Sequence, residues 1–245
     1  MDYTNLYSTR IQKTFDEDQT DIISAFRAEV AKNPKHEIQL INYYKGLPIS
    51  YNAKIATIEK DTLDLDVTPQ QAASIPPERY TFIRSKLFKH TILAGVQYVS
   101  VKHKALSVRK LCYVEILAER RKHVRLEIGQ PLPAMINSST GVIKGRIIEL
   151  SLGGAVMAAQ LNQEIADTNI TLSIMIPDTE LDTTYNVKLS ANLVENKNEN
   201  NLGRYAYSFS DVDKVTDRIM GKYLFRLQVE IIRELKDMIE IGTAQ

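Results

Sequence analysis

The sequence predicts a mainly β protein with two small antiparallel β-barrel domains, a helix near the N-terminus and a long helix at the C-terminus. Short runs that alternate apolar and polar residues fill most of the chain from residue 36 to residue 209, and turn residues separate them. Apolar residues at helical spacing occur near the two ends of the chain instead. A charged stretch from Glu119 to Arg125 divides the strand-like runs into two groups, which indicates two domains.

Length and composition agree with this fold class. The chain has 245 residues, which suits two domains of ordinary size, and its 44% hydrophobic and 25% charged residues are typical of a globular protein. The formal net charge of +1 gives no overall field that would draw the protein to nucleic acid or anionic lipid, so we expect no DNA partner. Any site for an anion must therefore be local.

Three features indicate a cytoplasmic protein. The first residues lack the basic segment and apolar core of a secretion signal, and no apolar run is long enough to span a membrane. Cys112 is the single cysteine, so a disulfide within the chain is excluded. We expect Cys112 to behave as a small buried apolar residue.

The first domain is expected to cover residues 1–117 and to begin with an amphipathic helix from Asp16 to Lys32. Asp18 or Thr20 is expected to cap this helix, and Asn33-Pro34 to end it. Its apolar residues recur at helical spacing, which predicts that it packs on the domain core; they are Ile22, Ile23, Phe26 and Val30.

Strands are expected through the rest of the first domain. A turn is expected at Lys45-Gly46-Leu47-Pro48 because glycine and proline interrupt the alternation there. The clearest strand is Thr62 to Val67, whose apolar side chains all fall on one face. The expected strands are residues 36–41, 49–58, 62–67, 80–83, 90–101 and 104–116.

The second domain is expected to cover residues 118–245, with strands after its charged opening segment. The polar run from Asn196 to Asn201 reads as a turn between the last two strands. The expected strands are residues 132–136, 141–150, 155–158, 170–176, 185–195 and 204–209.

A long helix from about Val212 to Ile241 is expected to end the chain, with Ser210 or Asp211 as its cap and Gly242 as its stop. We expect its apolar stripe either to cover an open end of the barrel or to pair with a second copy in a homodimer. The stripe consists of Val215, Ile219, Tyr223, Leu227, Ile231, Leu235 and Met238.

Arginines gather just before the first strand of the second domain. Arg121 and Arg125 are four residues apart, and Arg120 lies beside them. A guanidinium group offers paired donors to a phosphate or to the O6 and N7 edge of guanine, and its plane can stack on a base. Several arginines on one segment could therefore surround an anionic nucleotide.

A second motif, Glu149-x-Ser151-x-x-Gly154, ends a predicted strand about two dozen residues later. The Glu149 carboxylate can accept hydrogen bonds from the imino and amino groups of guanine, and the Ser151 hydroxyl can donate or accept. Gly153 and Gly154 carry no side chain, so that a ligand or a turning backbone can come close. The two motifs together suit a nucleotide site.

This combination resembles the PilZ family, bacterial receptors for cyclic di-GMP whose pattern is RxxxR followed by D/NxSxxG. The first half is complete in Arg121-Lys122-His123-Val124-Arg125, and the second half has Glu149 where the family has Asp or Asn. The resemblance covers residues from about 119 to 240, and the preceding β domain resembles the layout of flagellar-brake proteins. It implies ligand contacts for Arg120, Arg121, Arg125, Glu149, Ser151, Gly153 and Gly154.

The resemblance also implies a function: a cyclic di-GMP receptor and adaptor that is not an enzyme and needs no cofactor. Ligand would order the arginine segment between the domains and change the interaction with an unidentified protein partner, in flagellar motility or at the envelope. A ligand-independent scaffold or dimerisation module is the alternative. Neither a metal site nor a Ser151 nucleophile is expected, since the four histidines are scattered, and His123 is expected to be solvated.

Overall fold

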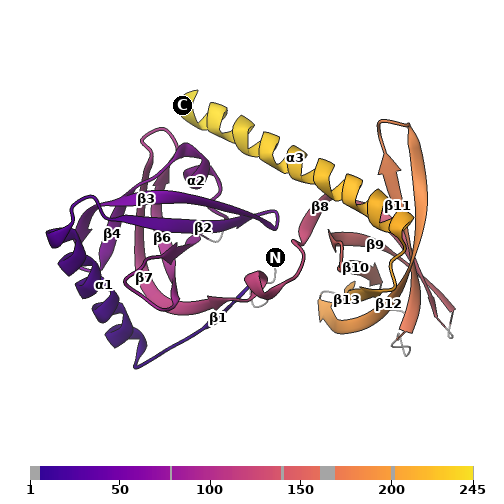
Figure 1. The fold of residues 1–245 in the computed structure, drawn as a ribbon, viewed down its shortest axis with the longest axis horizontal. Helices are drawn as coiled ribbons and strands as arrows, with labels where there is room; N and C mark the ends of the chain where they lie inside the picture. The colour runs from indigo at the N-terminus through magenta and orange to yellow at the C-terminus, as the bar shows by residue number, and fades with distance from the viewer. Residues whose placement is uncertain (1–5, 78, 139–140, 161–168, 200–201, 245) are drawn as a thin grey trace. The chain divides into compact units, whose positions relative to one another are not determined.

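The computed structural model describes residues 6–77, 79–138, 141–160, 169–199 and 202–244 (Figure 1). The chain forms two compact units, one of residues 1–121 with 231–245 and one of residues 122–230. The expected boundary between residues 117 and 118 stays a prediction.

An antiparallel sheet with the strand order β1-β7-β4-β3-β2-β5-β6 forms most of the first unit. An additional pairing of β6 with β7 joins the ends of this order, so six strands form a closed ring to which β1 is attached. The strands are β1 (Tyr7–Thr9), β2 (Glu37–Tyr44), β3 (Leu47–Glu59), β4 (Thr62–Asp66), β5 (Tyr80–Arg84), β6 (Thr91–Ser100) and β7 (Ala105–Ile116).

The alternation of β4 explains why this sheet forms. Leu63 and Leu65 are fully or almost fully buried, while Thr62 and Asp64 are partly exposed. The turn that joins β2 to β3 contains only Lys45 and Gly46, whose φ angles are 49° and 81°. Two positive φ angles suit a tight hairpin, so β3 begins at Leu47 and the expected four-residue turn was too long.

Helix α1 (Phe15–Lys32) packs Ile22 and Phe26 into the core of the first unit, as predicted. Its cap is Thr14, whose side chain accepts a hydrogen bond from the backbone N–H of Glu17, so the caps expected at Asp18 or Thr20 were wrong. Asp18 is buried instead and accepts backbone N–H groups that precede the helix. Two short helices were not predicted, α2 (Pro69–Ala73) and the 3₁₀ helix η2 (Leu117–Arg120).

The second unit is a closed antiparallel barrel with the strand order β10-β13-β12-β11-β8-β9. The mainly β fold with small barrels is therefore confirmed. The strands are β8 (Leu126–Ser138), β9 (Gly141–Ser151), β10 (Gly154–Gln160), β11 (Asn169–Asp178), β12 (Thr183–Glu199) and β13 (Leu202–Ser210). The turn expected from Asn196 was wrong up to Glu199, because β12 continues there; Asn200 and Asn201 lie outside the described residues.

Helix α3 (Lys214–Ala244) begins after Asp213, whose Oδ1 accepts the backbone N–H groups of Val215 at 2.9 Å and Thr216 at 3.0 Å. The caps expected at Ser210 or Asp211 and the stop expected at Gly242 were therefore wrong. The predicted stripe is buried at Leu227, Ile231 and Leu235, but Val215 is 68% exposed and Met238 is 39% exposed. Within the described residues, no helix is both long and apolar enough to cross a membrane.

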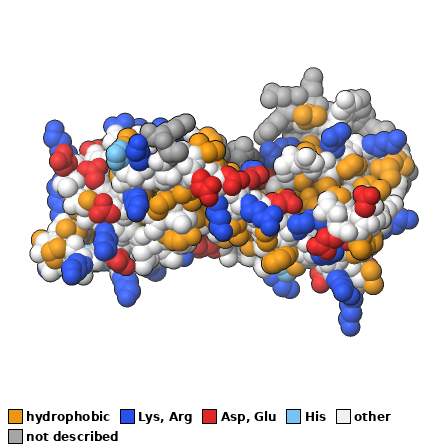
Figure 2. Space-filling view, turned by 90° about the horizontal axis from the view of Figure 1, so that it is seen from above, with side chains coloured by type: hydrophobic (Ala, Val, Ile, Leu, Met, Phe, Trp, Pro, Cys, Tyr) orange, Lys and Arg blue, Asp and Glu red, His pale blue; other side chains and the backbone are white. Residues whose placement is uncertain are grey.

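Charges of both signs are mixed on the face of the molecule that Figure 2 shows. On the face shown in Figure 2, lysine and arginine side chains lie among aspartate and glutamate side chains and do not form a single basic field. This agrees with the net charge of +1 and leaves anion binding to local groups.

We expect the cap of α3 to make stability depend on pH. Hydrogen bonds from the side chain and then the backbone of Thr216 hold the pKa of Asp213 below its ordinary value. A lowered pKa stabilises the fold at neutral pH, and this contribution is lost as pH falls through the folded-state pKa. Asp213→Ala should therefore lower the melting temperature at pH 7, measured by circular dichroism, and the difference from wild type should shrink in acid.

Asp213→Asn is the matched control, because asparagine caps helices about as well as aspartate but does not titrate. It should melt like wild type at pH 7 and above wild type in acid. An Asp213→Ala variant that melts like wild type at pH 7 would contradict this role for Asp213.

Candidate ligand-binding site

The candidate site lies on the outer face of the barrel, over β9, β10 and β13. In β13 Tyr205 and Tyr207 are buried, whereas Arg204, Ala206 and Ser208 are partly exposed, so these alternate residues face outward. Directly paired residues of neighbouring strands share a face, so strand register assigns the same face of β10 and β9 as well.

Three rows of paired residues follow on this outer face. The row nearest the β9–β10 turn contains Ser151, Gly154 and Ser208. The next contains Glu149, Val156 and Ala206, and a third contains Arg146, Ala158 and Arg204. A bulge opposite the Val156–Met157 step shifts the register of β9, so Ile148 is the extra residue and Glu149 pairs with Val156. Small side chains thus form a low surface with Glu149 and arginines at its edges.

The β9–β10 turn is tightly built. Ser151 is buried, and its hydroxyl donates a hydrogen bond to the carbonyl oxygen of Gly154 at 3.1 Å. A Cβ atom on Gly154 would lie 2.3 Å from the carbonyl oxygen of Tyr207, so only glycine fits against β13 there. A Cβ atom on Gly153 would lie 3.0 Å from the His123 ring. His123 is thus partly buried over this turn, and the expectation of a solvated side chain was wrong.

Glu149 has two guanidinium partners. Nη2 of Arg204 donates to its Oε1 at 2.9 Å, and Nη1 of Arg125 lies 3.6 Å from its Oε2. All three side chains are partly buried, with exposed fractions of 19% for Glu149, 25% for Arg204 and 30% for Arg125. Arg204 was not predicted, because only the pairing of β10 with β13 brings it beside a residue 55 positions away.

The remaining two predicted residues belong to the first unit. Arg120 ends η2, and its guanidinium group donates to Oε1 of Glu115, with 2.7 Å between Nε and the oxygen. Arg121 follows η2, and its backbone N–H donates to the carbonyl oxygen of Ala118. The structure therefore brings Arg125 together with Glu149 and the Ser151–Gly154 turn, and it describes Arg120 and Arg121 with the first unit.

The family comparison covers this part of the chain. Residues 119–226 match the family model described as PilZ domain. This segment is a PilZ domain. A protein of Aquifex aeolicus (strain VF5), described as uncharacterized, is 27% identical over 135 residues, a match that spans 53% of this chain and 60% of that protein.

Solved structures are similar over longer stretches at low identity. Escherichia coli YcgR in complex with c-di-GMP is 15% identical with a TM-score of 0.44, covering 98% of this chain and 99% of that one. The Bacillus subtilis inhibitor of motility (MotI/DgrA) is 14% identical with a TM-score of 0.43, covering 80% and 97%. The K. pneumonia MrkH-c-di-GMP complex is 14% identical with a TM-score of 0.42, covering 93% and 99%.

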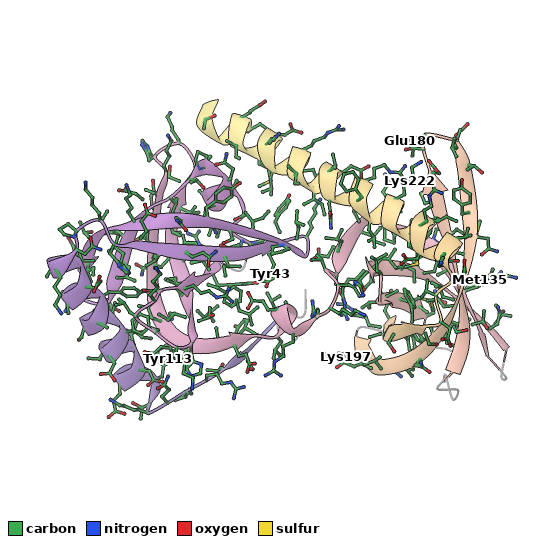
Figure 3. All side chains as sticks on the ribbon, viewed as in Figure 1. Tyr43, Tyr113, Met135, Glu180, Lys197 and Lys222 are labelled. Atoms are coloured by element: carbon green, nitrogen blue, oxygen red, sulfur yellow. The ribbon has the colours of Figure 1, made fainter. Side chains whose placement is uncertain are left out.

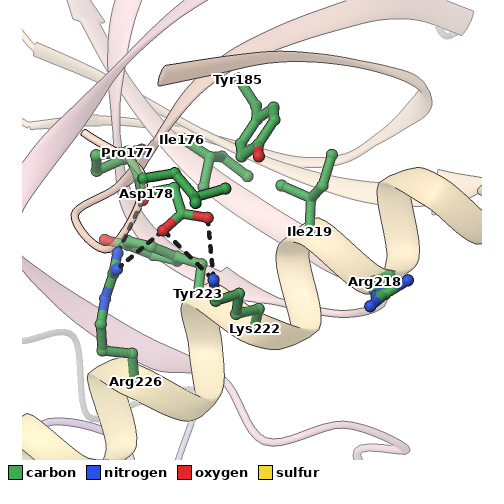
Figure 4. Close-up of a pocket in the computed structure, with 10 residues that line it drawn as sticks. Ile176, Pro177, Asp178, Tyr185, Arg218, Ile219, Lys222, Tyr223 and Arg226 are labelled. Carbon is green, nitrogen blue, oxygen red and sulfur yellow. Dashed lines mark hydrogen bonds and ion pairs between the residues drawn. The ribbon is translucent and has the colours of Figure 1, made fainter. Parts of the chain in front are cut away.

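The PilZ domain also has a pocket of about 210 Å³ between α3 and the end of the β11–β12 hairpin (Figure 4). The buried Asp178 accepts hydrogen bonds from Nζ of Lys222, the shorter at 3.1 Å. Arg226 donates to the carbonyl oxygen of Pro177 and to the hydroxyl of Thr179, both at 2.8 Å. The remaining lining residues are Ile176, Leu181, Tyr185, Arg218, Ile219 and Tyr223.

The charged side chains of this pocket join α3 to the β11–β12 hairpin, so the pocket is not a free anion site. Lys222 also pairs with Glu180 at 2.7 Å, and Figure 3 shows the two side chains near each other. Burial raises the pKa of Asp178, but hydrogen bonds from Lys222 and from backbone N–H groups outweigh it and leave the pKa below its ordinary value. Three cationic side chains line the pocket, and two of them, Lys222 and Arg226, thus have protein partners. Within the described residues, no group of three or more metal-ligating side chains occurs.

The close approach at Gly154 gives a stability prediction. Gly154→Ala should force β10 away from β13 and destabilise the PilZ domain by about 2–3 kcal/mol, in the range of overpacked sites. The matched control is Gly129→Ala, because no atom lies within 4 Å of a Cβ added there. Urea unfolding of both variants measures the difference, and equal midpoints would contradict the packing described for Gly154.

Proposed function

We propose that this chain is a cyclic di-GMP receptor that binds its ligand on the outer face of the PilZ barrel and acts as an adaptor without catalysis. One observation carries the proposal. Within the segment that matches the PilZ model, Arg125, Glu149 and the Ser151–Gly154 turn lie together, although Arg125 is separated from the others in sequence. Arg125, Ser151 and Gly154 match the PilZ pattern, and Glu149 keeps a carboxylate where the pattern has Asp or Asn.

The chemistry of these groups suits guanine. The Glu149 carboxylate can accept from the imino and amino groups of the base, and Arg125 can donate to its O6 and N7 atoms. Beside them, Ala158 and Ala206 are partly exposed and carry small side chains, while Val156 between the two rows is buried. The small side chains of Ala158 and Ala206 would leave room for a flat base.

Arg120 and Arg121 would add contacts to the ligand phosphates. They precede Arg125 by at most five residues, and the backbone between them and β8 has no helix or strand. The pair of Arg120 with Glu115 is a small obstacle, because the Arg120 side chain is 61% exposed and exposed ion pairs contribute little. Ligand would then order the segment from Arg120 to Arg125 and change what the protein binds next.

The regulated partner is proposed to be a protein of the flagellar motor or of the envelope, reached in the cytoplasm. This rests on the resemblance in layout to flagellar-brake proteins. The net charge of +1 favours a protein partner over DNA, and so do the mixed charges on the face shown in Figure 2.

A ligand-independent scaffold is the second candidate, and two contacts favour it. Glu149 already has two arginine partners, and Arg120 is already bound to Glu115. Arginines held in this way could fix the segment without any ligand. Calorimetry separates the two candidates.

Isothermal titration of the full chain with cyclic di-GMP should give a dissociation constant in the micromolar range or below. Arg125→Ala should weaken binding by about 10- to 100-fold, since a charge-assisted hydrogen bond contributes roughly 1.5–3 kcal/mol. Arg218→Ala removes the same charge from a different face of the same domain and should leave binding unchanged. Absence of binding by the wild-type chain would overturn the proposal in favour of the scaffold.

A further inference from the structure

Arg204 holds the guanine-accepting carboxylate in place. We propose that it is a positioning residue that sets the preference for guanine by fixing Glu149, an inference that rests on the proposed function. Glu149 is one methylene longer than the aspartate of the PilZ pattern and therefore has one more rotatable bond. A carboxylate that must meet two donors on a base edge needs this extra freedom restricted.

The two arginine partners of Glu149 hold it unequally. The contact with Arg204 is a hydrogen bond at 2.9 Å, whereas the 3.6 Å separation from Arg125 is too long for one. The two contacts also use different oxygens, Oε1 for Arg204 and Oε2 for Arg125. A ligand can therefore take the place of Arg125 at Oε2 while Arg204 keeps Oε1.

The backbone that carries Arg204 is also held more firmly than the backbone that carries Arg125. Arg204 lies inside β13, where it pairs with Ala158 on one side and Lys197 on the other. Arg125 lies just before β8, in a segment without helix or strand. Moving Arg204 would disturb the barrel, while moving Arg125 would not. The geometry thus gives Arg204 a fixed role and leaves Arg125 free to exchange onto the ligand.

The hydrogen bond from Arg204 limits where the carboxylate can lie. Without it, the Glu149 side chain is free to turn away from the position where a guanine edge would meet it.

The test is a comparison of two ligands on Arg204→Gln. Isothermal titration with cyclic di-GMP should show affinity about 10-fold weaker or more, the loss expected for a charge-assisted hydrogen bond. Titration with cyclic di-AMP should change by less than about 3-fold, because adenine lacks the imino donor, so the preference for guanine should fall. Arg218→Gln is the matched control, since Arg218 lines the pocket beside α3 of the same domain and lies outside the outer face over β9, β10 and β13. It should keep the preference of wild type.

A second variant separates positioning from folding. Glu149→Asp shortens the carboxylate and removes the extra rotatable bond, so it should weaken cyclic di-GMP binding in the wild-type chain but strengthen it in the Arg204→Gln chain. A merely structural role for Arg204 would not reverse the sign of this effect. Melting temperatures of all variants show whether each is folded.

The outcomes are distinct. Wild-type binding with a preference that Arg204→Gln leaves unchanged overturns the role of Arg204 alone. Absence of cyclic di-GMP binding by wild type overturns the proposed function and this inference together.

Discussion

The pairing of β10 with β13 is the constraint on which the candidate site depends. It closes the barrel of the PilZ domain, and it places Gly154 so close to the Tyr207 carbonyl that no side chain fits. The same pairing sets the register that puts Arg204 on the outer face beside Glu149. The close approach at Gly154 and the ion pair of Arg204 with Glu149 both depend on this single strand contact.

Much of the fold could be predicted because each barrel strand has one buried face. Period-two alternation survives in segments such as β4 and β13, where Leu63, Leu65, Tyr205 and Tyr207 are buried and their neighbours in the strand are partly or fully exposed. Polar composition predicted the positions of turns less well. The run after Asn196 reads as a turn by its residues, yet β13 pairs with β12 through this stretch and holds it extended. The helix caps were predicted wrongly because several suitable residues lie near each helix start. Only the backbone geometry shows that Thr14 and Asp213 accept the hydrogen bonds.

The candidate site could be predicted only where its residues form a motif. Arg125, Glu149, Ser151 and Gly154 are found by spacing, because the β9–β10 hairpin and the segment before β8 are local in sequence. Arg204 carries no such signal, since its approach to Glu149 exists only after the barrel closes. His123 was misjudged because nothing in the sequence shows that its ring covers Gly153. Residues from strands that meet only on closure are therefore those that sequence reasoning misses.

The proposed site depends on local charge in a protein that is almost neutral. Glu149 is partly buried, with a hydrogen bond from Arg204 at Oε1 and a longer contact to Arg125 at Oε2. In this account, binding exchanges one arginine–carboxylate contact for contacts to a base and a phosphate. The cost of breaking the loose contact is small, so recognition depends on how well the carboxylate is held.

A crystal structure of the chain with cyclic di-GMP tests this account most directly. The account predicts a guanine edge on the outer face of the barrel at Oε2 of Glu149, with Arg204 still hydrogen-bonded to Oε1 and Arg125 moved onto the ligand. A ligand bound elsewhere on the molecule, or a guanine that meets neither Glu149 nor the Ser151–Gly154 turn, would contradict it.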